Sequence, residues 1–331
     1  MKYVLNLGEI LIDFIPTARV RLGEVCYSPH AGGAIANVAV VIARLGGSSR
    51  FVGGMAEDEF GRLLEQTLID NRVDTQYVCV IKGAATTVAL VTLQADGQRN
   101  FTFFRQETAD CQLRAEDLNW SAWHDTAICH VGGVLLSTEP ARAATFAAME
   151  HTRRLGSIVS FDVNVRSSLW VSPADIRNTI TRGVEQADIL KLSADEVEFI
   201  GEQSSLPAGP LDKSWLNTVG DALLARGPRF VIITLGAHGA LLLTERHRVE
   251  IPQLLVRPVD TTGAGDAFMG AILFQLAQQG YNAPSDLASL SEHDLSHLGS
   301  FANRVAALSV TRYGGISSFP FMHEVNGFSA T

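Results

Sequence analysis

The sequence of 331 residues predicts an α/β protein in which helices cover both faces of a mostly parallel sheet. Short apolar segments with the length of buried strands alternate with segments of helical spacing along most of the chain. Hydrophobic residues make up 47% of the sequence, which is ample for a large core. Two pairs of short segments leave no room for helices and predict a small antiparallel sheet.

The elements are expected in the following order. The strands are Val4–Leu7, Arg50–Val52, Ile128–Val131, Ile158–Phe161, Phe230–Thr234 and Ala240–Leu243, with the end of another at Leu254–Val259. The helices are Ala36–Leu45, Glu59–Asn71, Arg142–Leu155, Leu216–Ala225, Ala267–Gln279 and Phe301–Val310. A loop is expected near 203–213. No internal repeat is visible, so residues 1–331 are interpreted as a single domain.

The additional sheet is expected to form a lid. Its strands are Ile10–Ile15 with Val20–Tyr27, and Thr86–Leu93 with Arg99–Phe104. Asp96-Gly97 joins the second pair and is a strong signal for a hairpin turn. Because these strands flank a glycine cluster in sequence, we interpret residues 10–27 and 86–105 as a lid over a site. The alternative is an edge extension of the main sheet.

Composition excludes several classes of protein. The net charge of -9, without a block of Lys and Arg, argues against a nucleic-acid or membrane-surface binder. The N-terminus leads directly into a strand and no apolar run approaches 18 residues, so we expect a cytoplasmic protein. Four cysteines are widely separated and form no C-x-x-C pair, which predicts reduced, structural thiols: Cys26, Cys79, Cys111 and Cys129.

The most informative segment is Asp260–Phe268, with the sequence DTTGAGDAF. Its glycines precede a helix, where unpaired N–H groups and the positive end of the helix dipole can hold an anion. Gly263 and Gly265 let the backbone approach that anion closely. Asp266 would repel the anion unless a metal, or a hydroxyl that needs a base, lies between them. The segment therefore predicts an enzyme of phosphoryl transfer.

This segment has two other interpretations. Asp is a preferred helix cap, so Asp266 alone could serve only to start the helix. The segment lacks the Gly-Lys-Ser/Thr ending of a Walker A loop and the G-x-G-x-x-G of a dinucleotide fold. A nicotinamide oxidoreductase would carry that second motif after the first strand, where Gly8 stands alone.

A second glycine turn occurs in Ala31–Ala39. Gly32 and Gly33 allow a ligand to touch the backbone, and the Asn37 amide can both donate to and accept from the hydroxyls of a polyol. Asp13 is an acidic residue on an otherwise apolar strand. It could accept hydrogen bonds from vicinal hydroxyls, or it could simply be solvated.

Taken together, these motifs resemble the ribokinase-like (PfkB) sugar kinase family. The likeness includes the Ala31–Ala39 turn, Ala43–Gly47, Glu57–Gly61 and Asp260–Phe268, and it extends from Val4 to about Phe319. Ala56 departs from the family, which usually has Gly at that position, so a turn there must tolerate a Cβ. The resemblance implies a ribokinase-like three-layer α/β/α fold with a mostly parallel central sheet and a small antiparallel β lid.

The resemblance also implies transfer of the γ-phosphoryl group of ATP to a sugar hydroxyl, with Mg²⁺ as cofactor. In that family the aspartate matching Asp266 is the base, and the amides matching Gly263, Ala264 and Gly265 form the anion hole. Positioning and charge neutralisation supply most of the acceleration in phosphoryl transfer, and a carboxylate can take a proton that departs late.

Further site residues follow the strand Ile158–Phe161. The pattern D-x-N-x-R-x-x-L-W is similar to fructokinases, which implies that Asn164 faces substrate and nucleotide and that Arg166 clamps the transferred group. A surface ion pair is the alternative for Arg166. Glu196 matches the family residue that organises magnesium through water, although Ser193 replaces the usual Asn. A helix-start role is the alternative for Glu196.

The remaining nucleotide residues are implied by position. Lys191, two residues before Ser193, resembles the fructokinase version and is assigned to ATP. Thr234, Gly236 and Gly239 match the loop beside the ribose and phosphates, and Asn303 lies where relatives border the adenine. Asp260 and Thr262 match positions that surround a potassium-type ion in some relatives.

The lid sequence suggests which sugar is bound. Phe101 or Phe103 could cover a furanose while Arg105 reaches its polar edge, or the two phenylalanines could only pack the lid on the core. The expected reaction is fructose to fructose 6-phosphate, and a homodimer through the lid edge is plausible. Aminoimidazole riboside kinase, 2-keto-3-deoxygluconate kinase and a non-catalytic sugar or nucleotide sensor remain as alternatives.

Overall fold

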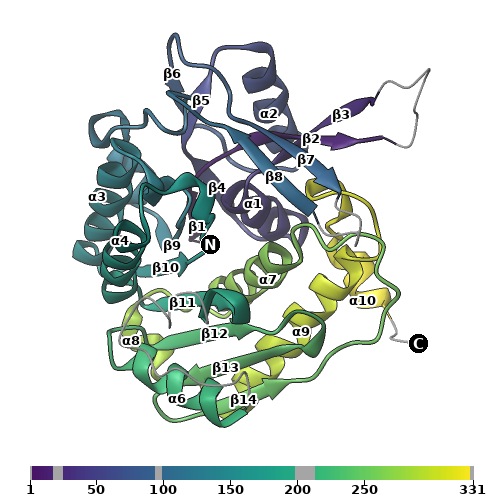
Figure 1. Cartoon of the computed structure of the whole chain (residues 1–331). Helices are drawn as coiled ribbons and strands as arrows, with labels where there is room; N and C mark the ends of the chain where they lie inside the picture. Colours follow the sequence, from purple (N-terminus) through teal and green to yellow (C-terminus); the bar gives the residue numbers. More distant parts are fainter. Residues whose placement is uncertain (1, 18–24, 94–98, 198–212, 329–331) are drawn as a thin grey trace.

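The computed structural model describes residues 2–17, 25–93, 99–197 and 213–328 (Figure 1). Its centre is an eight-stranded sheet of order β14-β13-β12-β11-β10-β9-β1-β4. The pairs from β4 to β12 are parallel and the last two are antiparallel, which confirms a mostly parallel sheet. The strands are β1 (Tyr3–Leu7), β4 (Ser49–Val52), β9 (Thr126–Gly132), β10 (Ile158–Asp162), β11 (Ile189–Ser193), β12 (Phe230–Thr234), β13 (Ala240–Thr244) and β14 (Arg248–Ile251).

Helices cover both faces of this sheet, so the fold has three layers (Figure 1). One face packs against α1 (Ala34–Arg44), α7 (Ala264–Gln278) and α9 (Glu292–Ser309). The other face packs against α3 (Ala141–Arg154), α4 (Pro173–Gln186) and α6 (Lys213–Leu224). Shorter or peripheral helices are α2 (Glu59–Asp70), α8 (Pro284–Leu287) and α10 (Met322–Gly327).

The central strands supply both cores because successive side chains of a strand point to opposite faces. In β12, Phe230 and Ile232 belong to the core beneath α1, α7 and α9. Val231 and Ile233 belong to the second core, beneath α3, α4 and α6. This explains why the strands read as continuous apolar runs rather than as alternating ones.

Several elements differ from the sequence expectation. The strands β11 and β14 and the helix α4 were not predicted. The helix has clear start signals, since Ser172 caps it by accepting from the amide of Asp175 and Pro173 begins it. Helix α9 begins at Glu292, well before the expected Phe301, with Ser291 as its cap. The expected loop near 203–213 lies almost entirely outside the described residues.

The strand expected at Leu254–Val259 is wrong, because the last strand ends at Ile251. Leu255 and Val259 are 70% and 44% exposed, so their apolar side chains are not part of a sheet. The amides of Val259 and Asp260 instead donate to the carbonyl of Val310, just after α9. The glycine segment therefore enters α7 from a loop rather than from a strand.

The lid is a separate four-stranded sheet of order β3-β2-β7-β8, so the edge-extension alternative is wrong. Its strands are β2 (Leu11–Pro16), β3 (Tyr27–Gly32), β7 (Val88–Leu93) and β8 (Arg99–Phe104). Both hairpins are antiparallel, as predicted, and β2 and β7 join them in parallel.

The second strand of the lid was expected at Val20–Tyr27, but β3 begins only at Tyr27. Residues 18–24 and the expected Asp96-Gly97 turn lie outside the described residues. Because β3 continues to Gly32, the lid leads directly into the first glycine turn and α1.

Three smaller expectations can be compared with the structure. Ala56 ends β5 (Gly54–Ala56), which pairs with β6 (Cys79–Ile81), and its φ is not positive, so the Cβ is tolerated. All four cysteines are free, and Cys79, Cys111 and Cys129 are buried. Within the described part of the chain, no helix is long and apolar enough to cross a membrane.

Asp58 fastens the lid to the core. Its carboxylate caps α2 by accepting from the amide of Gly61 at 2.7 Å. It also accepts from the amide and the hydroxyl of Thr86, just before β7, at 2.7 and 2.6 Å. Burial opposes ionisation, but these hydrogen bonds outweigh it and lower the pKa of Asp58.

We predict that Asp58→Ala lowers the free energy of unfolding by about 2 kcal/mol, because a helix cap and two further hydrogen bonds are lost. Since the pKa of Asp58 is lowered, its contribution is present at neutral pH and disappears on acidification through that pKa. Urea denaturation at pH 7 measures the difference. Glu65→Ala, an exposed change on the same helix, is the control; equal effects of the two changes would contradict the anchoring role.

Candidate active site

A cleft of about 1470 Å³ lies at the carboxyl ends of the parallel strands, with lid residues on one wall. Such an edge is where open α/β sheets bind ligands. Most of the predicted site residues line it: Asp13, Gly33, Asn37, Phe101, Phe103, Asn164, Arg166, Lys191, Glu196, Thr234, Gly236, Asp260, Thr262, Gly263, Ala264, Gly265 and Asp266. Four predicted residues are not among the lining residues: Gly32, Arg105, Gly239 and Asn303.

The start of α7 forms one part of the cleft. Gly263 is its N-cap, with φ of 75°, a left-handed conformation that glycine adopts without strain. The amides of the first helical turn point out of the helix, together with the positive end of its dipole. The amide of Ala264 donates to the carbonyl of Thr261 at 3.2 Å, so this member of the predicted anion hole has a hydrogen-bond partner within the loop.

Asp260 shapes the loop before α7. One carboxylate oxygen accepts from the amide and hydroxyl of Thr262, at 3.0 and 2.8 Å. The other accepts from the amide of Gly314 at 2.8 Å. Asp260 thus connects this loop to the segment after α9, independently of any bound cation.

Asp266 is the third residue of α7 and does not cap the helix, so the cap interpretation is wrong. Its carboxylate accepts a hydrogen bond from the side-chain amide of Asn37 at 2.8 Å. Burial raises the pKa of Asp266 to about 6, although the charge of Lys191 and the bond from Asn37 act in the opposite direction. A carboxylate with such a pKa is ionised at neutral pH and can accept a proton.

The first glycine turn brings Asn37 to this position. Gly33 is the N-cap of α1 with φ of 104°, and a Cβ on it would lie 2.6 Å from the carbonyl oxygen of Glu9. A Cβ on Gly32 would lie 2.2 Å from Oδ2 of Asp13. Gly32 therefore makes space for Asp13 rather than lining the cleft itself.

A buried charge cluster lies below α7. The ammonium group of Lys191 is 3.0 Å from both carboxylate oxygens of Asp162, and both residues are buried. Burial disfavours the ammonium ion, but Asp162, Glu196 and Asp266 outweigh it and raise the pKa of Lys191. A Cβ on Gly265 would lie 3.2 Å from the Lys191 ammonium nitrogen, so this cation lies directly under the expected anion hole.

Glu196 joins β11 to the loop that follows β10. Its two carboxylate oxygens accept from the amides of Val165 and Ser193, each at 2.8 Å. Burial raises the pKa of Glu196, and the charge of Lys191 lowers it. Each oxygen keeps a second lone pair that can meet a metal-bound water. Across the described ranges, no group of three or more His, Cys, Asp or Glu side chains is placed to hold a metal directly.

The loop after β10 is held in an unusual conformation. Asn164 has φ of 33°, and Arg166 is exposed at the rim of the cleft. The two residues therefore project into the cleft from the end of a central strand, as the sequence pattern predicted.

The residues that line the part of the cleft expected to hold a nucleotide base differ partly from the predicted ones. The side-chain amide of Asn303 donates to the carbonyl of Pro252 at 2.6 Å, which keeps it out of the cleft. Gly239 supports the loop from behind, since a Cβ there would lie 2.0 Å from the carbonyl oxygen of Ile251. The sequence analysis missed several lining residues here: Leu216, Leu235, His238, Pro258, Val259 and Tyr313.

In the lid, Phe101 and Phe103 line the cleft with stacked rings whose centroids are 6.2 Å apart. They do not only pack the lid on the core. Arg105 does not line the cleft: its side chain is 4% exposed and forms an ion pair with Asp110 at 2.6 Å. Glu9, to which no role was assigned from the sequence, does line the cleft, as do Leu11 and Val134.

Comparison with known protein families gives one match over almost the whole chain. A model described as the pfkB family carbohydrate kinase matches residues 1–322. Fructokinase-1 of Oryza sativa subsp. japonica is 40% identical over 326 residues, which cover 98% of this chain and 96% of that protein.

Solved structures give the same result. Fructokinase of Xylella fastidiosa with bound ATP has a TM-score of 0.89 and 31% identity, covering 98% of this chain and 97% of that one. Fructokinase of Vibrio cholerae O395 with fructose, ADP and calcium ion has a TM-score of 0.83 and 32% identity, covering 99% of each chain. Aminoimidazole riboside kinase of Salmonella enterica, complexed with aminoimidazole riboside and an ATP analogue, has a TM-score of 0.80 and 31% identity. The match covers 98% of each chain.

We predict that Asp162→Asn lowers the free energy of unfolding by about 3 kcal/mol, because the buried ammonium group of Lys191 loses its carboxylate partner. Thermal unfolding followed by circular dichroism measures this loss. Adding Lys191→Met should restore part of the stability, since the unpaired charge is then removed. Additive losses in the double variant would contradict a direct coupling of the two side chains.

Proposed function

The chain belongs to the pfkB family of carbohydrate kinases, and from this premise we propose that it transfers the γ-phosphoryl group of ATP to fructose, giving fructose 6-phosphate. As a carbohydrate kinase it is a phosphotransferase that uses an alcohol group as acceptor. The proposal of fructose is supported by the identity of the similar proteins and by the residues on the sugar side of the cleft.

The observation that carries the proposal is the position of Asp266. Its carboxylate is in the first turn of α7, bound by Asn37, and it lines the same cleft as lid residues and the glycines before the helix. A hydroxymethyl group beside Asp266 would have its base within reach. It could attack a γ-phosphorus held at the glycine amides from the side opposite the leaving ADP, which is the in-line geometry of phosphoryl transfer.

We assign proton acceptance to Asp266. The carboxylate takes the proton of the attacking hydroxyl as the new bond to phosphorus forms. Because its pKa is about 6, the base is ionised at neutral pH and becomes protonated as the pH falls through that value. Asn37, by donating to Oδ2, leaves the other carboxylate oxygen to face the hydroxyl.

The phosphate side is assigned to three kinds of group. The amides at the start of α7 stabilise the negative charge of the transferred phosphoryl group. Lys191 adds a buried positive charge under Gly265, and Arg166 adds an exposed one at the rim. Asn164, Thr234 and Gly236 are assigned to the rest of the nucleotide.

We propose Mg²⁺ as the metal cofactor, held through water by Glu196 and directly by nucleotide phosphates. The fit is good because Glu196 lines the cleft and keeps unused lone pairs, while no cage of protein ligands is needed for this ion. Bound there, the ion would neutralise phosphate charge. A monovalent cation beside Asp260 and Thr262 is a further prediction.

On the sugar side, the cleft combines polar and aromatic groups. Asp13 and Asn37 can bind hydroxyls, and the Gly33 turn lets a ring approach the backbone. Phe101 and Phe103 offer a cover from the lid. A 2-keto-3-deoxygluconate substrate would need a cation here, but Arg105 is already engaged with Asp110 and Ser137.

Three predictions stay open with this proposal: a homodimer, a cytoplasmic location, and the absence of nucleic-acid and membrane partners. For the homodimer, β3 and β8 are the edge strands of the lid sheet and could pair with a second copy.

We expect ADP release with fructose to exceed that with aminoimidazole riboside, ribose, adenosine and 2-keto-3-deoxygluconate by at least tenfold in kcat/KM. The assay is run with Mg²⁺ or EDTA, and with K⁺ or Na⁺. Preference for aminoimidazole riboside would replace fructose as the substrate. An absence of turnover on every compound would favour a sugar or nucleotide sensor and would overturn the kinase proposal.

We predict that Asp266→Asn lowers kcat by about 10³-fold, because the amide keeps the shape of the side chain but cannot accept the proton. In the parent enzyme, kcat/KM should fall as the pH drops below about 6, where Asp266 becomes protonated. Stopped assays from pH 5 to 9 measure both effects. Asp70→Asn, on exposed helix α2, is the matched control; turnover of the Asp266 variant within about threefold of the parent would remove its assigned role.

A further inference from the structure

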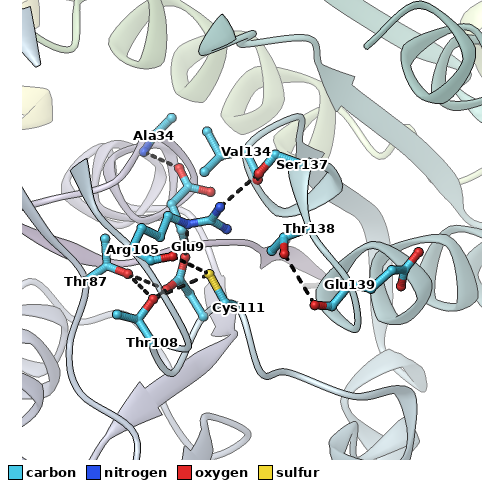
Figure 2. A network of polar contacts seen from close by, with 11 residues as sticks. Glu9, Ala34, Thr87, Arg105, Thr108, Cys111, Val134, Ser137, Thr138 and Glu139 are labelled. Carbon is cyan, nitrogen blue, oxygen red and sulfur yellow. Dashed lines mark hydrogen bonds and ion pairs between the residues drawn. The ribbon is translucent and has the colours of Figure 1, made fainter. Parts of the chain in front are cut away.

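A buried polar network connects the lid to the core where the two lid strands β7 and β8 meet it (Figure 2). Asp110 is its centre: Oδ1 accepts from the hydroxyls of Thr87 and Thr108, and Oδ2 accepts from Nε of Arg105 at 2.6 Å. Arg105 then donates through Nη1 to the hydroxyl of Ser137, in the core, at 2.9 Å. The network therefore fixes the base of the lid relative to the central sheet.

Glu9 lies at the edge of this network and is only 1% exposed. Its Oε1 accepts from the amide of Ala34, the first residue of α1, at 2.8 Å. Its Oε2 has no hydrogen-bond partner, and neither has Nη2 of the neighbouring Arg105. The two side chains, drawn together in Figure 2, thus influence each other through their charges.

This carboxylate costs stability. Burial raises the pKa of Glu9 to about 7, an effect that Asp110 increases and Arg105 reduces. The carboxylate of Glu9 interacts with two backbone amides, its own and that of Ala34, and the neutral side chain of Gln could accept from both. A buried charged group whose hydrogen bonds do not require the charge is typical of a functional position rather than a packing one.

The site explains what the charge can do. Glu9 holds the first turn of α1, and Asn37 in that same turn donates to Asp266. Glu9 also lines the sugar side of the cleft, next to Val134 and Leu11. A change at Glu9 is therefore expected to affect the sugar-binding residues and the proposed base. The residues assigned to phosphate binding, at β11 and β12, lie elsewhere in the cleft.

We propose that Glu9 is a positioning residue: in its ionised form, beside Arg105 of the lid, it fixes the start of α1 and thereby sets Asn37 and Asp266 for the sugar hydroxyl. This inference rests on the proposed function, since it concerns the efficiency of the same reaction. The charged groups that face Glu9 are Arg105 and Asp110, both at the base of the lid. Protonation of Glu9 loosens the connection between lid and α1.

The pH profile is the first test and needs no variant. The acid limb of log kcat/KM for fructose should contain two ionisations in the parent enzyme: a fall of about tenfold from Glu9 near pH 7, followed by the limb of slope one from Asp266 near pH 6. A single ionisation near pH 6 would overturn the proposal.

The second test is Glu9→Gln. We expect the KM for fructose to rise about tenfold, the KM for ATP to stay within about twofold, and the step near pH 7 to disappear from the acid limb. Glu139→Gln, at an exposed glutamate close to the network, is the control and should change none of these. An unchanged fructose KM and an unchanged acid limb in Glu9→Gln would overturn the positioning role.

Thermal unfolding separates this role from a structural one. Because the pKa of Glu9 is higher in the folded protein than its ordinary value, the parent should lose stability between about pH 4.5 and pH 7 relative to the variant. Glu9→Gln should therefore unfold a few degrees above the parent at pH 8, with a smaller difference at pH 5. A lower Tm of the variant at pH 8 would identify Glu9 as structural and overturn the proposal.

The two proposals fail separately. If the parent enzyme turns over no compound of the substrate panel, the kinase proposal itself is overturned. Normal turnover on fructose with an unchanged Glu9→Gln profile overturns only the positioning role.

Discussion

The hydrogen bond between Asn37 and Asp266 is the contact on which the geometry of the cleft depends. It joins the first turns of α1 and α7, two helices that lie together on one face of the central sheet. Each helix is entered through a glycine with positive φ, Gly33 or Gly263. Both helices contact β1 and β9, which are neighbours in the sheet, and these two strands therefore bring α1 beside α7. The proposed proton acceptor, sugar side and phosphate side are all positioned relative to this bond.

The electrostatics of the cleft support the proposal that phosphate binds there together with a cation. Three carboxylates, Asp162, Glu196 and Asp266, share one buried ammonium group, that of Lys191. Burial raises the pKa of Glu196 and Asp266 because water is excluded and the single cation cannot neutralise both. A nucleotide that arrives with a metal ion would relieve this imbalance, whereas a bare polyphosphate would add to it. The arrangement thus agrees with the proposed metal-dependent reaction.

Elements whose signal is local could be predicted from the sequence. Continuous apolar runs located six of the eight strands of the central sheet, all but β11 and β14, and two glycine turns located residues of the cleft, including Asn37 and Asp266. Prediction failed where tertiary contacts decide the outcome. Asn303 lies on the expected helix, but the carbonyl of Pro252 captures its amide. Arg105 was predicted to reach the sugar, but its guanidinium group is paired with the carboxylate of Asp110, five residues away. The role proposed for Glu9 could not be predicted, because Ala34 and Arg105, the residues it interacts with, are distant in sequence. The only local signal was an acidic residue within an apolar segment.

The lid is made of two short segments, β2 to β3 and β7 to β8, which pair with each other rather than with the central sheet. The groups assigned to phosphate chemistry lie mostly after Asp162, in a different part of the chain. On the proposed assignment, mutations in the lid segments would change which acceptor is covered while leaving the phosphate-binding residues unaltered. This separation of the two halves of the site along the chain would explain why the DTTGAGDAF segment indicates a kinase but not its sugar.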